Sequence, residues 1–391
     1  MMASDQHSSS QIRLVLALGI AQTLGWGSTF YLPAILAQPM ARDLGVEESS
    51  VFAAFSAALV LTAILGPLIG RLIDVHGGRR MLTLSSILFA AGLVLLSQAT
   101  DSLTLWFAWM VIGLGMATGL YEAAFASLTV LYGSRARSAI TGITLMAGFA
   151  STICWPLSAA LEVELGWRGV CLFWAAVHLL LGLPLNHFMM PSWRHSETTV
   201  LADSEQPPPN HNTLMVLLAF VFAVTWFTST AMAAHLPRLL QDSGLSLAAS
   251  VAIAGLIGPA QVLARLLEFS LLRQFHPLLS ARLASLSHPA GALLMMVFGA
   301  PFAVFFTIMH GLGNGILTIA KGTLPLALFG PHGYGVRQGW LSLPARLLQA
   351  AAPFMFALMI NRFGLNALWL TLLLGLLASI VLWRIKPQPA A

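Results

Sequence analysis

Three ionisable residues stand inside long apolar stretches of the sequence: Glu122, Lys321 and Arg346. An ionised side chain in hydrocarbon is costly, so such residues usually face protein or water and serve a function. A carboxylate and an ammonium can pair, and the planar guanidinium fork matches a further carboxylate. Because two positive charges stand against one negative charge, we expect a small organic anion to bind here. An Arg346 that only caps helix ends is the structural alternative.

Glu122 and Lys321 lie at nearly equivalent positions of an internal repeat, which places the counterpart of Glu122 at Ile319 or Ala320. The two charges could therefore face each other across a cavity. They could form a permanent pair that fixes helix packing, or a gate that opens with substrate or proton, or they could lie apart by chance. A buried carboxylate that loses its partner takes up a proton more readily. Glu122 is thus the first candidate for a proton site.

Other polar and aromatic residues share helix faces with these charges or line the first apolar segment. Each of them also has a plain structural interpretation, as a packing residue or an interfacial anchor. The candidates for the substrate or proton pathway are His310, Asn314, Gln349, Gln22, Trp26 and Tyr31.

The composition excludes most classes of soluble protein. Of the 391 residues, 58% are hydrophobic and 8% are charged, whereas a soluble domain has roughly 25% charged residues. A soluble enzyme, a nucleic-acid binder and a disordered chain are therefore excluded as the main interpretation. No catalytic or phosphate-binding motif is present, and Cys154 and Cys171 lack zinc-site spacing. We expect no enzymatic activity, no metal and no cofactor.

The apolar residues form twelve continuous segments, each long enough to cross a bilayer as a helix. Strands of a membrane barrel would alternate polar and apolar residues instead. The sequence thus predicts an all-α membrane protein with twelve transmembrane helices. The segments are 12–37, 50–71, 80–99, 103–131, 138–162, 168–190, 213–237, 246–270, 278–299, 301–329, 338–361 and 363–384.

The basic residues orient these helices. If the N-terminus is cytoplasmic, most of the 19 Arg and Lys residues fall on the cytoplasmic side, Arg265 among them, and only four fall opposite: Arg42, Arg168, Arg238 and Arg362. Cytoplasmic loops carry such an excess, so we expect both termini inside. This distribution also accounts for the net charge of +5 without a nucleic-acid partner.

The two halves of the chain resemble each other. Gly133, Gly142 and Pro156 return 197 positions later as Gly330, Gly339 and Pro353, and Arg71-Leu72-Ile73-Asp74 is echoed by Arg265-Leu266-Leu267-Glu268. Compositional bias in two Gly- and Leu-rich halves is the alternative explanation. We predict pseudo-symmetric six-helix bundles at 1–190 and 213–391, joined by a Pro-rich cytoplasmic linker at 191–212. Repeated bundles of this kind hold substrate at their interface.

The loop between the second and third segments carries a recognisable motif, Gly70-Arg71-Leu72-Ile73-Asp74-Val75-His76-Gly77-Gly78-Arg79-Arg80. It resembles the hallmark of the major facilitator superfamily, with Val75 standing where a basic residue is usual. The resemblance implies a gate latch built on Gly70, Asp74, Gly77, Arg79 and Arg80, where a plain positive anchor would explain only the arginines. Gly25-Trp26-Gly27 and Gly166-Trp167-Arg168 resemble the monocarboxylate and oxalate/formate porter branch.

The resemblance implies a secondary active transporter that works by alternating access and moves a small, anionic organic solute, coupled to protons or by exchange. An efflux permease for a drug, antimicrobial or metalloid is the alternative, and an integral-membrane sensor or enzyme is a further one. We expect a monomer in a bacterial inner membrane, with lipid, protons and a small molecule as its partners.

Overall fold

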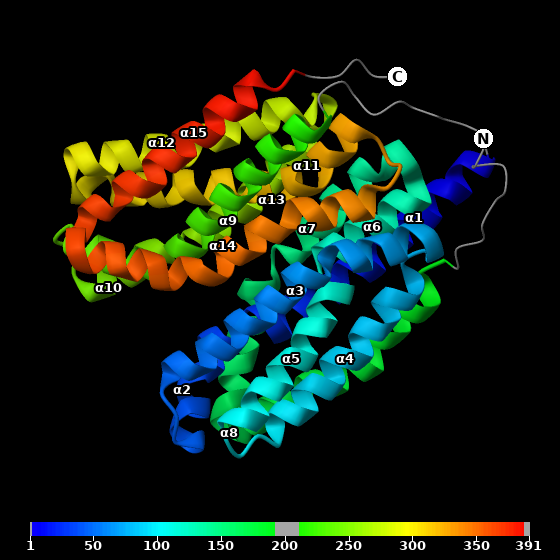
Figure 1. Cartoon of the computed structure of the whole chain (residues 1–391), viewed down its shortest axis with the longest axis horizontal. Helices are drawn as coiled ribbons and strands as arrows, with labels where there is room; N and C mark the ends of the chain where they lie inside the picture. Colours follow the sequence, from blue (N-terminus) through cyan, green and yellow to red (C-terminus); the bar gives the residue numbers. More distant parts are fainter. Residues whose placement is uncertain (1, 192–210, 387–391) are drawn as a thin grey trace.

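The computed structural model describes residues 2–191 and 211–386, which form helices and no strand (Figure 1). The first half contains α1 (Met2–Gly25), α2 (Pro33–Leu44), α3 (Glu48–His76), α4 (Arg79–Ser97), α5 (Ser102–Gly119), α6 (Tyr121–Tyr132), α7 (Ala136–Ala147) and α8 (Ala150–Val177). The second half contains α9 (His211–Asp242), α10 (Leu247–Ala254), α11 (Ile257–Ser270), α12 (Pro277–Phe298), α13 (Ala303–Phe329), α14 (Tyr334–Phe363) and α15 (Leu368–Arg384).

These helices are built to cross a membrane. Within the described residues, eight helical stretches are long and apolar enough for that, and the longest, Ser102–Met189, contains more than one span. Helices suit hydrocarbon because all their backbone hydrogen bonds are made within the segment. The arrangement is the predicted all-α fold of twelve transmembrane helices.

Several predicted spans are interrupted where the sequence suggested continuous helices. The first span contains a π-helical turn at Trp26–Phe30, and the fourth breaks at Leu120 between α5 and α6. The fifth is interrupted at Gly148 and Phe149, between α7 and α8. Gly166, with φ 65° and ψ 170°, lies instead in the gap that the sequence predicts between the fifth and sixth spans. Apolar composition predicts which segments lie in lipid, but it does not predict local breaks in a helix. Such breaks often mark functional positions.

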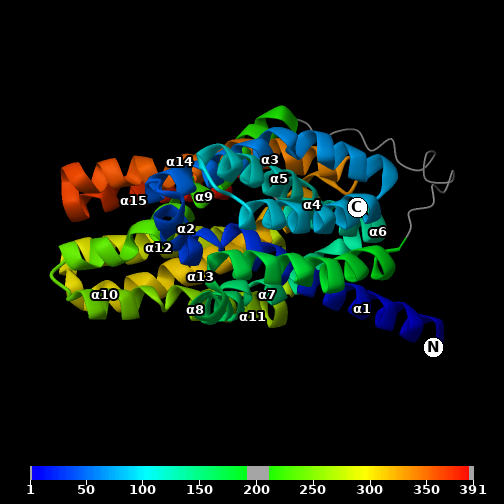
Figure 2. The same ribbon diagram turned by 90° about the horizontal axis from the view of Figure 1, so that it is seen from below.

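The helices gather into two bundles, one from each half of the chain (Figure 1). The bundles meet at the end where α1 begins and α15 ends, here called the terminal end. They diverge towards the opposite, distal end, where α2 and α8 lie in one bundle and α10 in the other. Figure 2 shows α1 projecting at the terminal end.

The tightest contact between the bundles is a seam of glycines on α3 and α14. Gly70 lies against Gly335, and Gly66 lies against Gly339, so closely that a Cβ at Gly70 would collide with the Gly335 carbonyl. Small residues allow helix backbones to approach in this way. The seam closes the terminal end of the interface.

Most of the predicted linker, from 192 to 210, lies outside the described residues. The domain boundaries therefore remain predictions.

Candidate functional site

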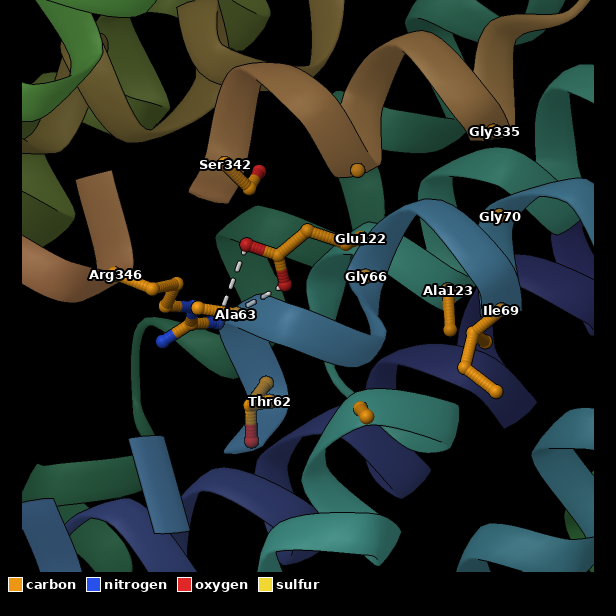
Figure 3. Close-up of a pocket in the computed structure, with 12 residues that line it drawn as sticks. Thr62, Ala63, Gly66, Ile69, Gly70, Glu122, Ala123, Gly335, Ser342 and Arg346 are labelled. Atoms are coloured by element: carbon orange, nitrogen blue, oxygen red, sulfur yellow. Dashed lines mark hydrogen bonds and ion pairs between the residues drawn. The ribbon is translucent and has the colours of Figure 1, made fainter. Parts of the chain in front are cut away.

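The three buried charges meet at the interface of the two bundles. Lys321 Nζ lies 2.5 Å from Glu122 Oε1. Arg346 Nη2 lies 3.2 and 3.0 Å from the two carboxylate oxygens, and Figure 3 shows these two contacts. The side chains of Lys321 and Arg346 are 2% and 1% exposed, and that of Glu122 is 16% exposed. One carboxylate from the first half is thus held by two cations from the second.

The local structure explains how each charge reaches this point. Leu120, with φ −80° and ψ −169°, separates α5 from α6 and puts Glu122 in the first turn of α6, where the positive end of the helix dipole favours an anion. Lys321 projects from α13 and Arg346 from α14. Gln349, one turn further along α14, accepts a hydrogen bond from Arg346 Nη1 at 3.0 Å.

Two tryptophans flank the charges. The Trp26 and Trp226 rings are stacked within 3° of parallel, with centroids 6.3 Å apart. The Arg346 guanidinium lies 5.6 Å from the first ring and 5.4 Å from the second, and Lys321 Nζ lies 4.6 Å from Trp226. Tyr121 packs 4.8 Å from Trp26. Cations over aromatic faces are stabilised by the ring quadrupole, so the site combines cations with flat apolar walls.

Several buried donors in this cluster have no acceptor. They are the Trp26 indole Nε1, the Arg346 Nε and the Gln349 Nε2. A buried donor without an acceptor costs free energy. Unsatisfied N–H groups beside two cations are suited to a ligand that brings oxygen acceptors, such as a carboxylate.

Gln22 and Tyr31 support the site from the first span. Gln22 donates a 2.6 Å hydrogen bond to the carbonyl of Gly119, the last residue of α5 before the break at Leu120. Tyr31 packs 6.3 Å from Trp26, and its own carbonyl accepts a hydrogen bond from Trp155. Gln22 therefore holds the helix break in place, and Tyr31 belongs to the aromatic wall.

His310 and Asn314 do not join the ion cluster, although they share a helix face with Lys321. His310 is eleven residues from Lys321, about 16 Å along α13. Both residues line a separate cavity inside the second bundle, where His310 bonds to His288. The helical spacing correctly predicted that these residues share one face of α13. It did not show how far His310 lies from Lys321 along the helix axis.

Arg265 is a residue that the sequence analysis counted only as a cation of the cytoplasmic side, not as a site candidate. It lies within α11 and is 5% exposed. No ion pair to Arg265 is present among the described residues, and its Nε has no hydrogen-bond partner. Its guanidinium packs against Gly148 of the first bundle. A buried cation without a counter-ion is a further candidate for anion binding.

The predicted latch bridges the two bundles. Asp74 accepts hydrogen bonds from the backbone N–H groups of Gly335 at 2.8 Å and Val336 at 2.9 Å, at the start of α14. The carboxylate thus caps a helix N-terminus of the other half. Gly77, with φ 76°, ends α3 just beyond. Arg79 and Arg80 begin α4 and make no ion pair among the described residues.

A second inter-bundle contact occupies the equivalent place in the repeat. Glu268 on α11 is 1% exposed and accepts a hydrogen bond from Arg137 of α7 at 3.2 Å. Arg137 also donates to the Phe275 carbonyl at 2.6 Å. Glu268 is the repeat counterpart of Asp74, so each bundle supplies one carboxylate that holds the other at the terminal end.

A cavity of about 20 Å³ connects the ion cluster to the first latch. It is lined by Thr62, Glu122 and Arg346 at one end and by Gly70 and Gly335 at the other (Figure 3). Its volume is enough for about one water molecule. Among the described residues no group of three or more His, Cys, Asp and Glu side chains could hold a metal ion.

Comparison with known proteins identifies the class. A family model of the Major Facilitator Superfamily matches residues 17–284. The chain belongs to this superfamily of membrane transporters.

Individual relatives agree with this assignment. The 3-(3-hydroxyphenyl)propionate transporter of Escherichia coli K12 is 28% identical, and the match covers 66% of each chain, just under two thirds. The structure of the human organic anion transporter MFSD10 has a TM-score of 0.77 at 17% identity, covering 95% of this chain and 99% of that one. The E. coli fucose:proton symporter has a TM-score of 0.75 at 14% identity, covering 96% and 100%.

Proposed function

We propose that the chain imports an aromatic monocarboxylate together with a proton across a bacterial inner membrane, with both termini in the cytoplasm. The observation that carries the proposal is the Glu122 carboxylate held by Lys321 and by Arg346, whose guanidinium lies near the rings of two tryptophans. The protein's own carboxylate occupies the position in which a substrate carboxylate would bind.

Charge balance gives the coupling. In the structure two cations face one carboxylate, so the cluster has a net charge of +1. A substrate anion that takes over Lys321 and Arg346 displaces Glu122, which then lacks a counter-ion in a buried site and favours its protonated form. The net charge stays at +1. Anion and proton therefore bind together, and neither adds an uncompensated charge to the buried interface.

The walls of the site favour an aromatic substrate. Trp26, Trp226 and Tyr121 present rings on which a flat apolar group can stack. Arg265, which lacks a counter-ion, provides a second anchor for a substrate oxygen. The relatives named for hydroxyphenylpropionate and for organic anions support this substrate class.

The latches provide the gate. Asp74 and Glu268 hold the terminal end together, while the bundles diverge at the distal end (Figure 1). With the termini in the cytoplasm, this is an outward-facing conformation. Substrate and proton enter from outside, and rocking of the bundles breaks both latches and opens the site inward.

Counterflow in proteoliposomes tests the proposal. Vesicles loaded with unlabelled 3-phenylpropionate should take up labelled 3-phenylpropionate, and excess cyclohexylacetate should compete less well than benzoate. Phenylethylamine, which carries the opposite charge, should not compete. Arg265→Gln should raise the KM for the carboxylate at least several-fold. Absence of carboxylate exchange, or better competition by the amine, would refute the proposal.

A further inference from the structure

The second bundle contains a pair of buried histidines that the central site does not use. His288 on α12 and His310 on α13 are 8% and 3% exposed, and their Nδ1 atoms lie 3.0 Å apart. The Phe306 ring lies beside both imidazoles, at 5.5 and 6.4 Å between centroids. One ring must donate its Nδ1–H and the other must accept it.

This arrangement has a definite proton capacity. In the neutral pair, the ring that donates from Nδ1 carries a free lone pair on its Nε2. His288 Nε2 is buried and has no partner, which fits His288 as the donor. A hydronium ion can transfer its proton to this nitrogen, forming an N–H bond and leaving water, while the Nδ1–H···Nδ1 bond remains. A second proton would place two N–H donors against each other, so the pair holds one.

The pair has space and polar surroundings in which to exchange that proton. A cavity of about 40 Å³ adjoins it, bounded by α9, α12, α13 and α15, and this volume exceeds what one water needs. Ser285, Asn314, Thr225 and Thr228 line it, and the buried hydroxyl of Thr228 also lacks a partner. The cavity is therefore polar enough to be hydrated.

No other charge competes for the proton. Among the described residues that line the cavity, none from the four surrounding helices is Asp, Glu, Lys or Arg. On α12 the preceding charged residue is Arg282, about 9 Å along the helix, and it bonds to carbonyls at the end of α15. On α13 the next charged residue is Lys321, about 16 Å away along the axis. The histidine pair is the titratable group of this cavity.

The cavity adjoins the central site through two helices. Thr225 lines the cavity, and its neighbour Trp226 contacts Lys321. On α13, Asn314 and Thr318 continue the face that leads from His310 to Lys321, and Thr318 donates to the Asn314 carbonyl at 2.7 Å. Neighbouring residues of α9 and one face of α13 thus link the cavity to the interface of the bundles.

We propose that the His288–His310 pair, with its adjoining cavity, is a second proton-binding site that is loaded and emptied once in each transport cycle. The inference rests on the proposed function, in which the Glu122 proton balances the charge of the monocarboxylate, so that transport with this proton alone is electroneutral. A second proton makes import electrogenic, with one net positive charge entering per cycle.

Uptake of 3-phenylpropionate into proteoliposomes under a potassium diffusion potential tests this inference. At equal pH on both sides, an inside-negative potential should accelerate wild-type uptake several-fold. His288→Asn and His310→Asn should lose this response but retain uptake driven by a pH gradient. The matched control is His235→Asn, which removes a half-buried histidine bonded to the Pro353 carbonyl and should respond like the wild type.

The outcomes separate the two proposals. Counterflow without a pH gradient or a membrane potential shows whether each variant is folded and exchanges substrate. If the wild type exchanges the carboxylate but its uptake does not respond to the potential, only the second proton site is refuted. The same holds if the histidine variants keep the full acceleration by the potential. A wild type without exchange refutes the proposed function and this inference with it.

Discussion

Replacing Glu122 by Gln should tighten substrate binding. The carboxylate accepts three hydrogen bonds from Lys321 and Arg346, and a substrate must displace it. Hydrogen bonds to charged groups contribute about 1.5–3 kcal/mol each. If the substrate no longer has to displace the Glu122 carboxylate, binding gains at least the lower limit of about 1.5 kcal/mol, which is about tenfold in affinity. The unliganded variant should lose about 3–5 kcal/mol of stability, because two buried cations lose their counter-ion.

The same variant should bind independently of pH. In the wild type one proton binds with each anion, so the affinity falls up to about tenfold per pH unit as the pH rises. Calorimetry with 3-phenylpropionate between pH 6 and 8 measures both effects, and Glu164→Gln, an exposed carboxylate, is the control. Accumulation driven by a pH gradient should fall, because one of the two protons proposed for each cycle no longer moves. A variant that keeps the full wild-type pH slope of binding would refute the role of Glu122.

Three further changes have defined outcomes. Trp226→Leu should weaken binding of aromatic carboxylates about tenfold by loss of stacking, with a smaller effect on aliphatic acids, as competition in counterflow would show. Asp74→Ala removes two charge-assisted hydrogen bonds, about 3 kcal/mol in total; cysteine-accessibility labelling should show the terminal end opening, and unchanged labelling would contradict the latch. Asp101 caps α5 and bonds to Thr104, which lowers the pKa of its carboxyl. Asp101→Ala should lower the Tm at pH 7, and the difference should fade as the pH falls through that lowered pKa.

Composition and periodicity were sufficient to predict the overall architecture. Continuous apolar runs with few charges have only one stable arrangement in lipid, the helix, so twelve spans could be counted directly. The break at Gly166 lies between two predicted spans, but the break at Leu120 was not predictable in the same way. It depends on how a single residue satisfies its backbone against neighbouring helices, and apolar composition carries no information on that.

The candidate site was partly predictable, because charged residues are rare in apolar segments and those that occur there usually have a function. This rule selected Glu122, Lys321 and Arg346, which the structure brings together. Trp226 was missed because tryptophan is common in membrane helices, although it follows Trp26 by 200 positions, close to the offset of the repeat. Arg265 was missed because span boundaries are uncertain by several residues, and a cation near a boundary looks like a loop anchor.

The internal repeat treats the latch contacts and the ion cluster differently. Asp74 and Glu268 occupy equivalent positions, and each holds the opposite bundle at the terminal end, which suits the proposed gate. The charges of the site break the symmetry: the repeat offers Glu122 no second carboxylate, and Arg265 is buried where its counterpart Arg71 is exposed. Two identical halves would place equal charges at their interface, and like charges repel. An anion site with a displaceable carboxylate therefore requires that the halves diverge at these positions.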